Sequence, residues 1–306
     1  MRVGLSGGGS SVDRLVEQAV QAERDGFASL WYPSGAGGDP LVAMALAGRA
    51  TSSIELGTAV LQTYPCHPVL QAQRAVSVVA AMGRPGFTLG VGPSHEPVID
   101  GQYGMSYEHP GRHTESYVGI LAAALRGEAV DVEGPDFRVH LPPRAATPAH
   151  SVPLLVAALA PRLLRVAGEK ADGTVLWMAT AKAIGQLVAP RIRDAAAKAG
   201  RAAPRIVAGI PVAVHDDVVE ARRAAAEQFA LYGRLPNYRR LLEAGGAGGP
   251  ADAVIVGDEA SVTTSIGALF EAGATDLWAA PFAVGPDGSG SRRRTRELLQ
   301  SLAQQP

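Results

Sequence analysis

Three polar side chains follow directly after an apolar run that ends in glycine: Ser94, His95 and Glu96 come after Phe87–Gly92. Ser94 and His95 can donate hydrogen bonds, and a histidine can also exchange a proton near neutral pH. A lone histidine usually has a structural role. At the carboxyl end of a barrel strand, however, it would lie where barrel enzymes build their active sites. The sequence leaves both interpretations open for His95.

The first and third apolar runs are also followed by small residues. Ser6–Ser11 holds three glycines without the GxGxxG spacing, so it indicates either a flexible loop or a close approach to a ligand. Gly57, Thr58 and Ala59 would leave room for a flat ring at a barrel mouth, although ordinary packing explains them equally well.

The loop after the second run, Pro33–Pro40, is glycine-rich. Trp31 and Tyr32 just before it could line a pocket or fill a core, and we assign Trp31 to the core. After the fifth run, Ala157–Ala160 leads into a helix that starts at Pro161. Free backbone N–H groups at such a helix start can bind a phosphate, although an ordinary strand–helix junction looks the same in sequence.

The sequence motifs of several catalytic classes are absent. HExxH, CxxC and P-loop patterns are absent, and Cys66 is the single cysteine. His109 and His113 have i, i+4 spacing but no third ligand, so we expect a solvated helix start and no metal site. We expect His67 to be a helix-start residue and Cys66 to be a partly buried, inert thiol. Without a side-chain catalyst, a bound cofactor is the best candidate to carry the chemistry.

The composition is that of a globular protein. The chain has 306 residues, 47% of them apolar, and a formal net charge of −1. This charge gives no indication of nucleic acid or anionic lipid as a partner. A leader peptide and membrane spans are not apparent, so we expect a cytoplasmic protein with one domain over residues 1–306.

Eight β-prone runs alternate with helical patterns, and they are apolar without a polar face, as expected for parallel strands covered on both sides. The runs are Val3–Leu5, Ala28–Pro33, Ile54–Gln62, Phe87–Gly92, Val152–Ala158, Gly173–Trp177, Arg205–Val214 and Asp276–Phe282. This order predicts an α/β fold, a (β/α)8 TIM barrel, with a small hairpin insertion at Val130–Pro142 after the fourth strand–helix unit. A doubly wound sheet is the alternative, because spacing alone does not close a barrel.

The sequence resembles the bacterial luciferase-like family of flavin and deazaflavin enzymes over nearly its whole length. The matching segments, in order, are Ala22–Pro33, Asp39–Gly92, Tyr107–Val139, Val152–Trp177 and Gly257–Pro281. Gly4–Ala19 and Leu89–Pro110 look most like the actinobacterial branch that uses coenzyme F420, akin to methylenetetrahydromethanopterin reductase.

The resemblance implies a tricyclic ring at the carboxyl end of the barrel, in contact with several strand ends. A bulge with a non-prolyl cis peptide would back the ring. The implied coenzyme contacts are Ser6 after the first strand, Thr58, Ala59 and Val60 in the bulge, Gly92, Pro93, Ser94 and His95 near the ring or its ribityl chain, Ala158, Leu159 and Ala160 at the phosphate, and Trp177 and Thr180 near the tail.

The resemblance also implies the activity: hydride transfer between F420 and a small organic substrate. One departure concerns the loop after the second strand, where several deazaflavin members carry an Asp-His pair and this chain has only small residues. Any proton transfer would then fall to His95, to Glu96 or to the substrate. The alternatives are a flavin mononucleotide (FMN)-dependent monooxygenase and a non-catalytic F420 carrier or sensor. Family members are often homodimers. The loops expected to select the substrate, Tyr103–His113 and Gly245–Gly257, match no recognition motif.

Overall fold

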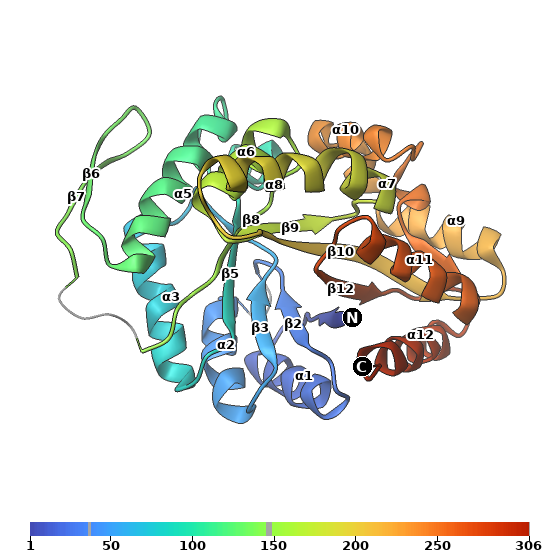
Figure 1. The fold of residues 1–306 in the computed structure, drawn as a ribbon. Coiled ribbons are helices and arrows are strands. Elements are labelled where there is room, and N and C mark those ends of the chain that lie inside the picture. The colour runs from blue at the N-terminus through green and yellow to red at the C-terminus, as the bar shows by residue number, and fades with distance from the viewer. Residues whose placement is uncertain (36–37, 145–148, 306) are drawn as a thin grey trace.

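Eight parallel strands close into a barrel in the computed structural model, which describes residues 1–35, 38–144 and 149–305. Each strand pairs in parallel with its two neighbours, and the β1–β12 pair completes the ring. Figure 1 shows these strands at the centre with helices around them. The predicted TIM barrel is confirmed, and the doubly wound alternative is wrong. The barrel strands are β1 (Arg2–Ser6), β2 (Ser29–Tyr32), β3 (Glu55–Thr58), β5 (Phe87–Gly92), β8 (Leu154–Val156), β9 (Gly173–Trp177), β10 (Arg205–Val214) and β12 (Asp276–Pro281).

The helices lie mainly outside the barrel, and proline often marks where they begin. Asp39 caps the helix that starts at Pro40, since its carboxylate accepts from the Leu41 N–H, and the His67 ring does the same for the helix that starts at Pro68. The helices are α1 (Val12–Arg24), α2 (Pro40–Ala50), α3 (Pro68–Met82), α4 (Glu96–Ile99), α5 (Pro110–Arg126), α6 (Pro161–Lys170), α7 (Ala181–Ala183), α8 (Ala189–Lys198), α9 (Val218–Gln228), α10 (Pro236–Ala244), α11 (Glu259–Glu271) and α12 (Gly288–Ala303).

The third predicted strand is interrupted. The apolar run Ile54–Gln62 predicts one strand, but β3 ends at Thr58, and a separate short strand, β4 (Leu61–Gln62), pairs with β5. Between them the peptide bond Ala59–Val60 is cis, at the position that the resemblance predicts.

A hairpin and one short strand lie outside the eight units. The predicted hairpin forms β6 (Val130–Glu133) and β7 (Arg138–Leu141), an antiparallel pair that stands beyond α5 in Figure 1. The helical segment that the alternating pattern predicts between β9 and β10 is present, and it includes a π-helical turn at Ile184–Val188. The short strand β11 (Ile255–Gly257), which extends the sheet beside β10, was not predicted.

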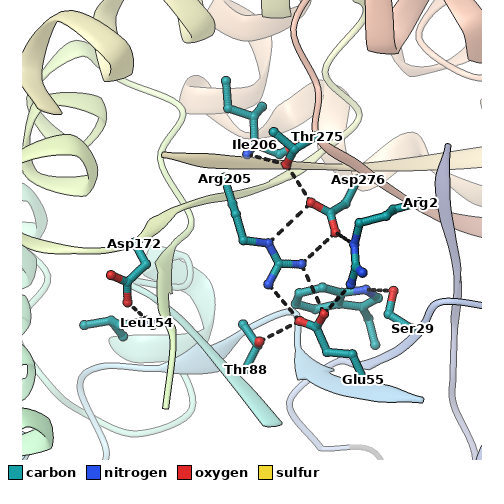
Figure 2. Close-up of polar contacts among 11 residues, drawn as sticks. Arg2, Ser29, Glu55, Thr88, Leu154, Asp172, Arg205, Ile206, Thr275 and Asp276 are labelled. Carbon is teal, nitrogen blue, oxygen red and sulfur yellow. Dashed lines mark hydrogen bonds and ion pairs between the residues drawn. The ribbon is translucent and has the colours of Figure 1, made fainter. Parts of the chain in front are cut away.

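Charged residues occupy the amino end of the barrel, because four strands begin with one (Figure 2). Arg205 donates to Glu55 at 2.9 Å and to Asp276 at 2.6 Å, and Arg2 donates to Asp276 at 2.8 Å. Burial raises the pKa of Asp276, but the hydrogen bonds and charge of Arg205 outweigh it and hold that pKa below its usual value. Ion pairs thus fill this end of the barrel.

Glycines inside the barrel make room for indole rings. A Cβ on Gly57 would lie 2.2 Å from the Trp31 ring, and one on Gly209 would lie 2.1 Å from the ring of Trp278. Trp31 is completely buried, as predicted, and its indole N–H donates to the Ser29 hydroxyl at 2.8 Å. Of the two interpretations of Gly57, ordinary packing is therefore correct, because Trp31 fills the space beside it.

Among the described helices, none is long and apolar enough to cross a lipid bilayer.

Candidate active site

A cavity of about 450 Å³ opens at the carboxyl ends of the barrel strands. This is the end at which barrel enzymes place their active sites. Ten residues predicted from the sequence line it: Ser6, Ala59, Val60, Gly92, Pro93, Ser94, His95, Leu159, Ala160 and Trp177. They come from the ends of β1, β5 and β9, from the bulge after β3 and from the loop before α6, so the barrel brings together residues far apart in sequence.

Three predicted residues are not part of the cavity wall. Thr58 is buried behind it, where its hydroxyl accepts from the Gly90 N–H at 2.7 Å and donates to the Gly90 carbonyl at 2.8 Å. Ala158 is fully buried and does not line the cavity. Thr180 caps α7, and its hydroxyl also donates to the Gly245 carbonyl at 3.3 Å. The structure places these three in supporting positions.

The loop Gly92–His95 is held by contacts from two other segments. Ser94 has a left-handed backbone, with φ of 62°, which turns the chain sharply before His95. The Tyr107 hydroxyl donates to the Ser94 carbonyl at 2.7 Å, and the Gln62 amide donates to the Ser94 hydroxyl at 3.4 Å. These bonds fix a turn that an L-residue otherwise disfavours.

His95 is a neutral group on the cavity wall. Burial lowers the pKa of its imidazole, so the uncharged ring dominates near pH 7. The ring centroid lies 5.8 Å from that of Tyr238. Glu96 is exposed and outside the lining. A neutral imidazole can donate or accept a hydrogen bond, which suits a binding residue better than a general acid.

The start of α6 offers free backbone donors to the cavity. Leu159, Ala160 and Leu163 line the cavity, and Ala160, the N-cap, provides no side-chain hydrogen bond to the first turn. The first N–H groups of a helix have no acceptor within it, and the helix dipole adds partial positive charge there. This is the geometry that binds phosphate groups.

An aromatic wall closes the side of the cavity that the sequence did not predict. Tyr232, Asn237 and Tyr238 reach it from a segment well beyond the end of β10, and Trp278 reaches it from β12. The indole rings of Trp177 and Trp278 stack with centroids 4.9 Å apart. The concentration of aromatic residues in Phe229–Tyr238 was the available signal, but nothing in the sequence places this segment over the barrel mouth.

The loop after β2 contributes Pro33 and Ser34 to the wall. Within the predicted glycine-rich stretch, Ala36 and Gly37 lie outside the described residues. The described part brings no titratable side chain to the cavity, in keeping with the missing Asp-His pair.

Two expectations about the outer loops need correction. His109 is exposed as predicted, but His113 stacks on Tyr64 with ring centroids 3.9 Å apart and is not solvated. Neither Tyr103–His113 nor Gly245–Gly257 lines the cavity directly. The first loop supports it instead, through the Tyr107 bond to Ser94 and a Tyr103 bond to Gln62 at 3.2 Å.

A second cavity, the α1–α12 groove, lies on the outer side of β1. Its volume is about 500 Å³, and its polar walls include Arg14 and Gln18 of α1 and Arg292 and Arg296 of α12. Ser6 contacts both cavities. Among the described residues, no group of three or more histidine, cysteine, aspartate and glutamate side chains is placed to hold a metal ion.

Comparisons with known proteins agree on one family. The sequence model described as luciferase-like monooxygenase matches residues 2–300. The 5,10-methylenetetrahydromethanopterin reductase of Methanolobus tindarius is 27% identical over 290 residues, covering 94% of this chain and 86% of that protein. The F420-dependent hydroxymycolic acid dehydrogenase of Mycobacterium tuberculosis is 31% identical over 232 residues, covering 71% of this chain and 63% of that one.

Solved structures share the fold. An F420-dependent secondary alcohol dehydrogenase, solved with an F420-acetone adduct, superposes with a TM-score of 0.76 at 19% sequence identity over 97% of both chains. At this identity the likeness concerns the barrel architecture alone.

Proposed function

Because the chain belongs to the luciferase-like monooxygenase family, we propose that it is an F420-dependent oxidoreductase that transfers a hydride between the deazaflavin and a small organic substrate. Relatives that cover most of this chain include a reductase of a pterin substrate and an enzyme named for its F420 dependence. These relatives favour F420 over FMN.

The observation that carries the proposal is the pairing of an apolar cavity with a free helix start. The cavity volume of about 450 Å³ is in the usual range for sites that enclose a small ligand or cofactor. Its apolar walls suit a flat ring, and the uncapped start of α6 suits a phosphate. A ring joined to a phosphate through a flexible chain has both features.

The residues present fit such a group. Ala59 and Val60 would back the ring, Gly92–His95 would contact its edge or its chain, and the backbone N–H groups around Ala160 would hold the phosphate. The buried Trp177 indole N–H lies close to the Tyr232 hydroxyl and could donate to that oxygen or to a bound molecule. When bound, the deazaflavin would supply a ring carbon that gives or accepts the hydride.

The chain itself would position the reactants and exclude water. Walls of Val60, Trp177 and Tyr238 would hold two flat molecules at contact distance, and positioning of this kind is a large part of enzymatic rate enhancement. His95, neutral near pH 7, would orient the coenzyme or the substrate through one hydrogen bond.

Titration with each coenzyme tests this proposal. Purified protein is mixed with F420 or FMN, and quenching of coenzyme fluorescence gives each dissociation constant. We expect saturable binding of F420 and much weaker binding of FMN. Tight binding of FMN with no effect on F420 would instead favour the monooxygenase. Binding of F420 without hydride transfer to any member of a substrate panel would favour the carrier or sensor.

We also infer a homodimer, as in many family members. Val42 and Leu46, one turn apart on α2, and Leu70 on the neighbouring helix α3 are each about half exposed, and a patch of such side chains would suit a subunit interface. Light scattering coupled to size exclusion gives the mass, and Leu46→Glu should shift a dimer towards the monomer. A monomeric mass for the wild-type protein would exclude this assembly.

A further inference from the structure

The cavity wall carries no charged side chain among the described residues. Its titratable members are His95, Tyr232 and Tyr238, and the residues outside the described ranges have no charged side chains either. Burial favours the neutral form of all three groups, because it lowers the pKa of His95 and raises the pKa of both tyrosines. The wall is therefore uncharged near pH 7.

The same wall is rich in aromatic rings. Besides the stacked pair Trp177 and Trp278, Tyr232 and Tyr238 meet edge to face with centroids 4.8 Å apart. Tyr238 also lies beside His95. Ring faces and edges of this kind favour a flat or cyclic apolar partner.

Two exposed side chains with large apolar surfaces are linked to residues that line the cavity. Tyr103 and Leu231 are 49% and 58% exposed, respectively. Tyr103 is tied to the lining residue Gln62 through its hydroxyl, and Leu231 precedes the lining residue Tyr232. Exposed apolar groups that gather near a binding cavity can extend its ligand-binding surface.

The guanidinium of Arg240 comes close to the wall. Arg240 donates to the Asn237 amide oxygen, so it contacts a lining residue without being part of the lining. It is exposed to solvent, which weakens its attraction for a charge inside the cavity. The α6 start would hold the coenzyme phosphate, so a substrate carboxylate or phosphate elsewhere in the cavity would lose its hydration with no opposite charge on the wall to offset the cost.

We propose that the substrate is a neutral, largely apolar molecule with an aromatic or cyclic group, and not a carboxylate or a phosphate ester. The proposal rests on the function proposed above, since it describes the second molecule in the same cavity. Asn237 and the hydroxyls of Tyr232 and Tyr238 are the polar groups of the aromatic wall that could orient it.

A matched pair of probes tests the charge preference. Acetophenone and 4-acetylbenzoate share a ring and a ketone, but the second also carries a carboxylate. Ligand-detected NMR, at a pH near 7 and with and without F420, gives the affinity of each. We expect acetophenone to bind at least about 100-fold more tightly, which corresponds to about 2.8 kcal/mol. Equal affinities, tighter binding of the carboxylate, or binding of neither probe would overturn the proposal.

A positive charge added to the cavity wall provides a second test of the proposal. Asn237 is half-buried at the cavity edge, so the fold should tolerate Asn237→Arg. This substitution should reduce the ratio of the acetophenone affinity to the 4-acetylbenzoate affinity at least about tenfold. Glu243→Arg, on the exposed side of the same helix α10, adds a guanidinium away from the cavity and should leave the ratio unchanged. An unchanged ratio in Asn237→Arg would show that the probes bind elsewhere and would overturn the proposal.

Failure of this inference can be told apart from failure of the proposed function. Loss of F420 quenching with the neutral preference intact would remove the coenzyme assignment and keep the wall's selectivity. Normal F420 binding together with preference for the carboxylate would keep the coenzyme assignment and remove the proposed preference for a neutral substrate.

Discussion

Gly92→Ala should damage both the fold and coenzyme binding, because the new methyl group has no space. A Cβ at Gly92 would lie 2.8 Å from the Ala157 Cβ and 3.0 Å from the Val60 Cγ2. Carbon atoms pack at about 3.5–4.0 Å, so Ala157 and Val60 must each move away from residue 92 by roughly 0.5–0.7 Å. The backbone of Gly92 is extended and suits alanine, so the effect is steric.

Overpacking of this kind costs about 1–3 kcal/mol of unfolding free energy. Val60 and Gly92 both line the cavity, so the same displacement should weaken F420 binding by about tenfold, or about 1.4 kcal/mol. Urea unfolding measures the first effect and quenching of F420 fluorescence the second.

Gly8→Ala is the matched control, because that glycine is exposed and a Cβ there meets no atom within 4 Å. It should leave stability and F420 affinity near the wild-type values. If Gly92→Ala lost stability but bound F420 normally, the coenzyme would not lie against Gly92. If it lost neither, the contacts among Gly92, Val60 and Ala157 would be wrong.

Three other substitutions test separate parts of the molecule. His95→Asn should weaken F420 binding by about tenfold, the worth of one hydrogen bond, without loss of stability in urea unfolding. Tyr107→Phe removes the bond to the Ser94 carbonyl, so it should cost about 1 kcal/mol in urea unfolding and should also weaken F420 binding. Asp276→Asn leaves Arg205 without its main partner and should cost about 3–5 kcal/mol by the same assay. The stability that the Asp276 carboxylate contributes is fully present above its unfolded-state pKa of about 4 and should be lost as the pH falls further, since its folded-state pKa is lower.

For each of these substitutions, one result would refute the prediction. Wild-type F420 affinity in His95→Asn would return that histidine to a structural role, and unchanged binding in Tyr107→Phe would mean that the Ser94 turn holds without the tyrosine. For Asp276→Asn the control is Glu128→Gln, whose ion pair with Arg126 is half-exposed and should matter by less than about 1 kcal/mol. Equal losses of unfolding free energy in Asp276→Asn and Glu128→Gln would contradict the role of burial at the amino end of the barrel.

The strand pattern was predictable because buried parallel strands are short apolar runs with sharp ends. Phe87–Gly92, Gly173–Trp177 and Arg205–Val214 have the same bounds in the sequence prediction and in the structure. The run Ile54–Gln62 looked equally continuous, yet it breaks at Ala59–Val60. The residue pattern alone showed no break there, and only the family resemblance pointed to it.

The site was predictable where residues follow a strand directly, and not elsewhere. The barrel places the carboxyl end of every strand at one mouth, so Gly92–His95 and Leu159–Ala160 were candidates by position, and the family resemblance selected them as coenzyme contacts. Tyr232 and Tyr238 belong to a segment that folds back over the mouth, a tertiary arrangement that local sequence does not encode. Small residues were ambiguous for another reason, because Gly57 packs against Trp31 and Gly92 faces the cavity, although both looked like bare backbone.

A crystal structure of the protein with F420 tests the central claim most directly. We predict the deazaflavin ring between the Ala59–Val60 bulge and Gly92–His95, with the phosphate at the backbone N–H groups around Ala160. The α1–α12 groove is the competing location, because Arg14, Arg292 and Arg296 could attract an anionic coenzyme there. Density for F420 in that groove, with the cavity at the strand ends empty, would contradict the account.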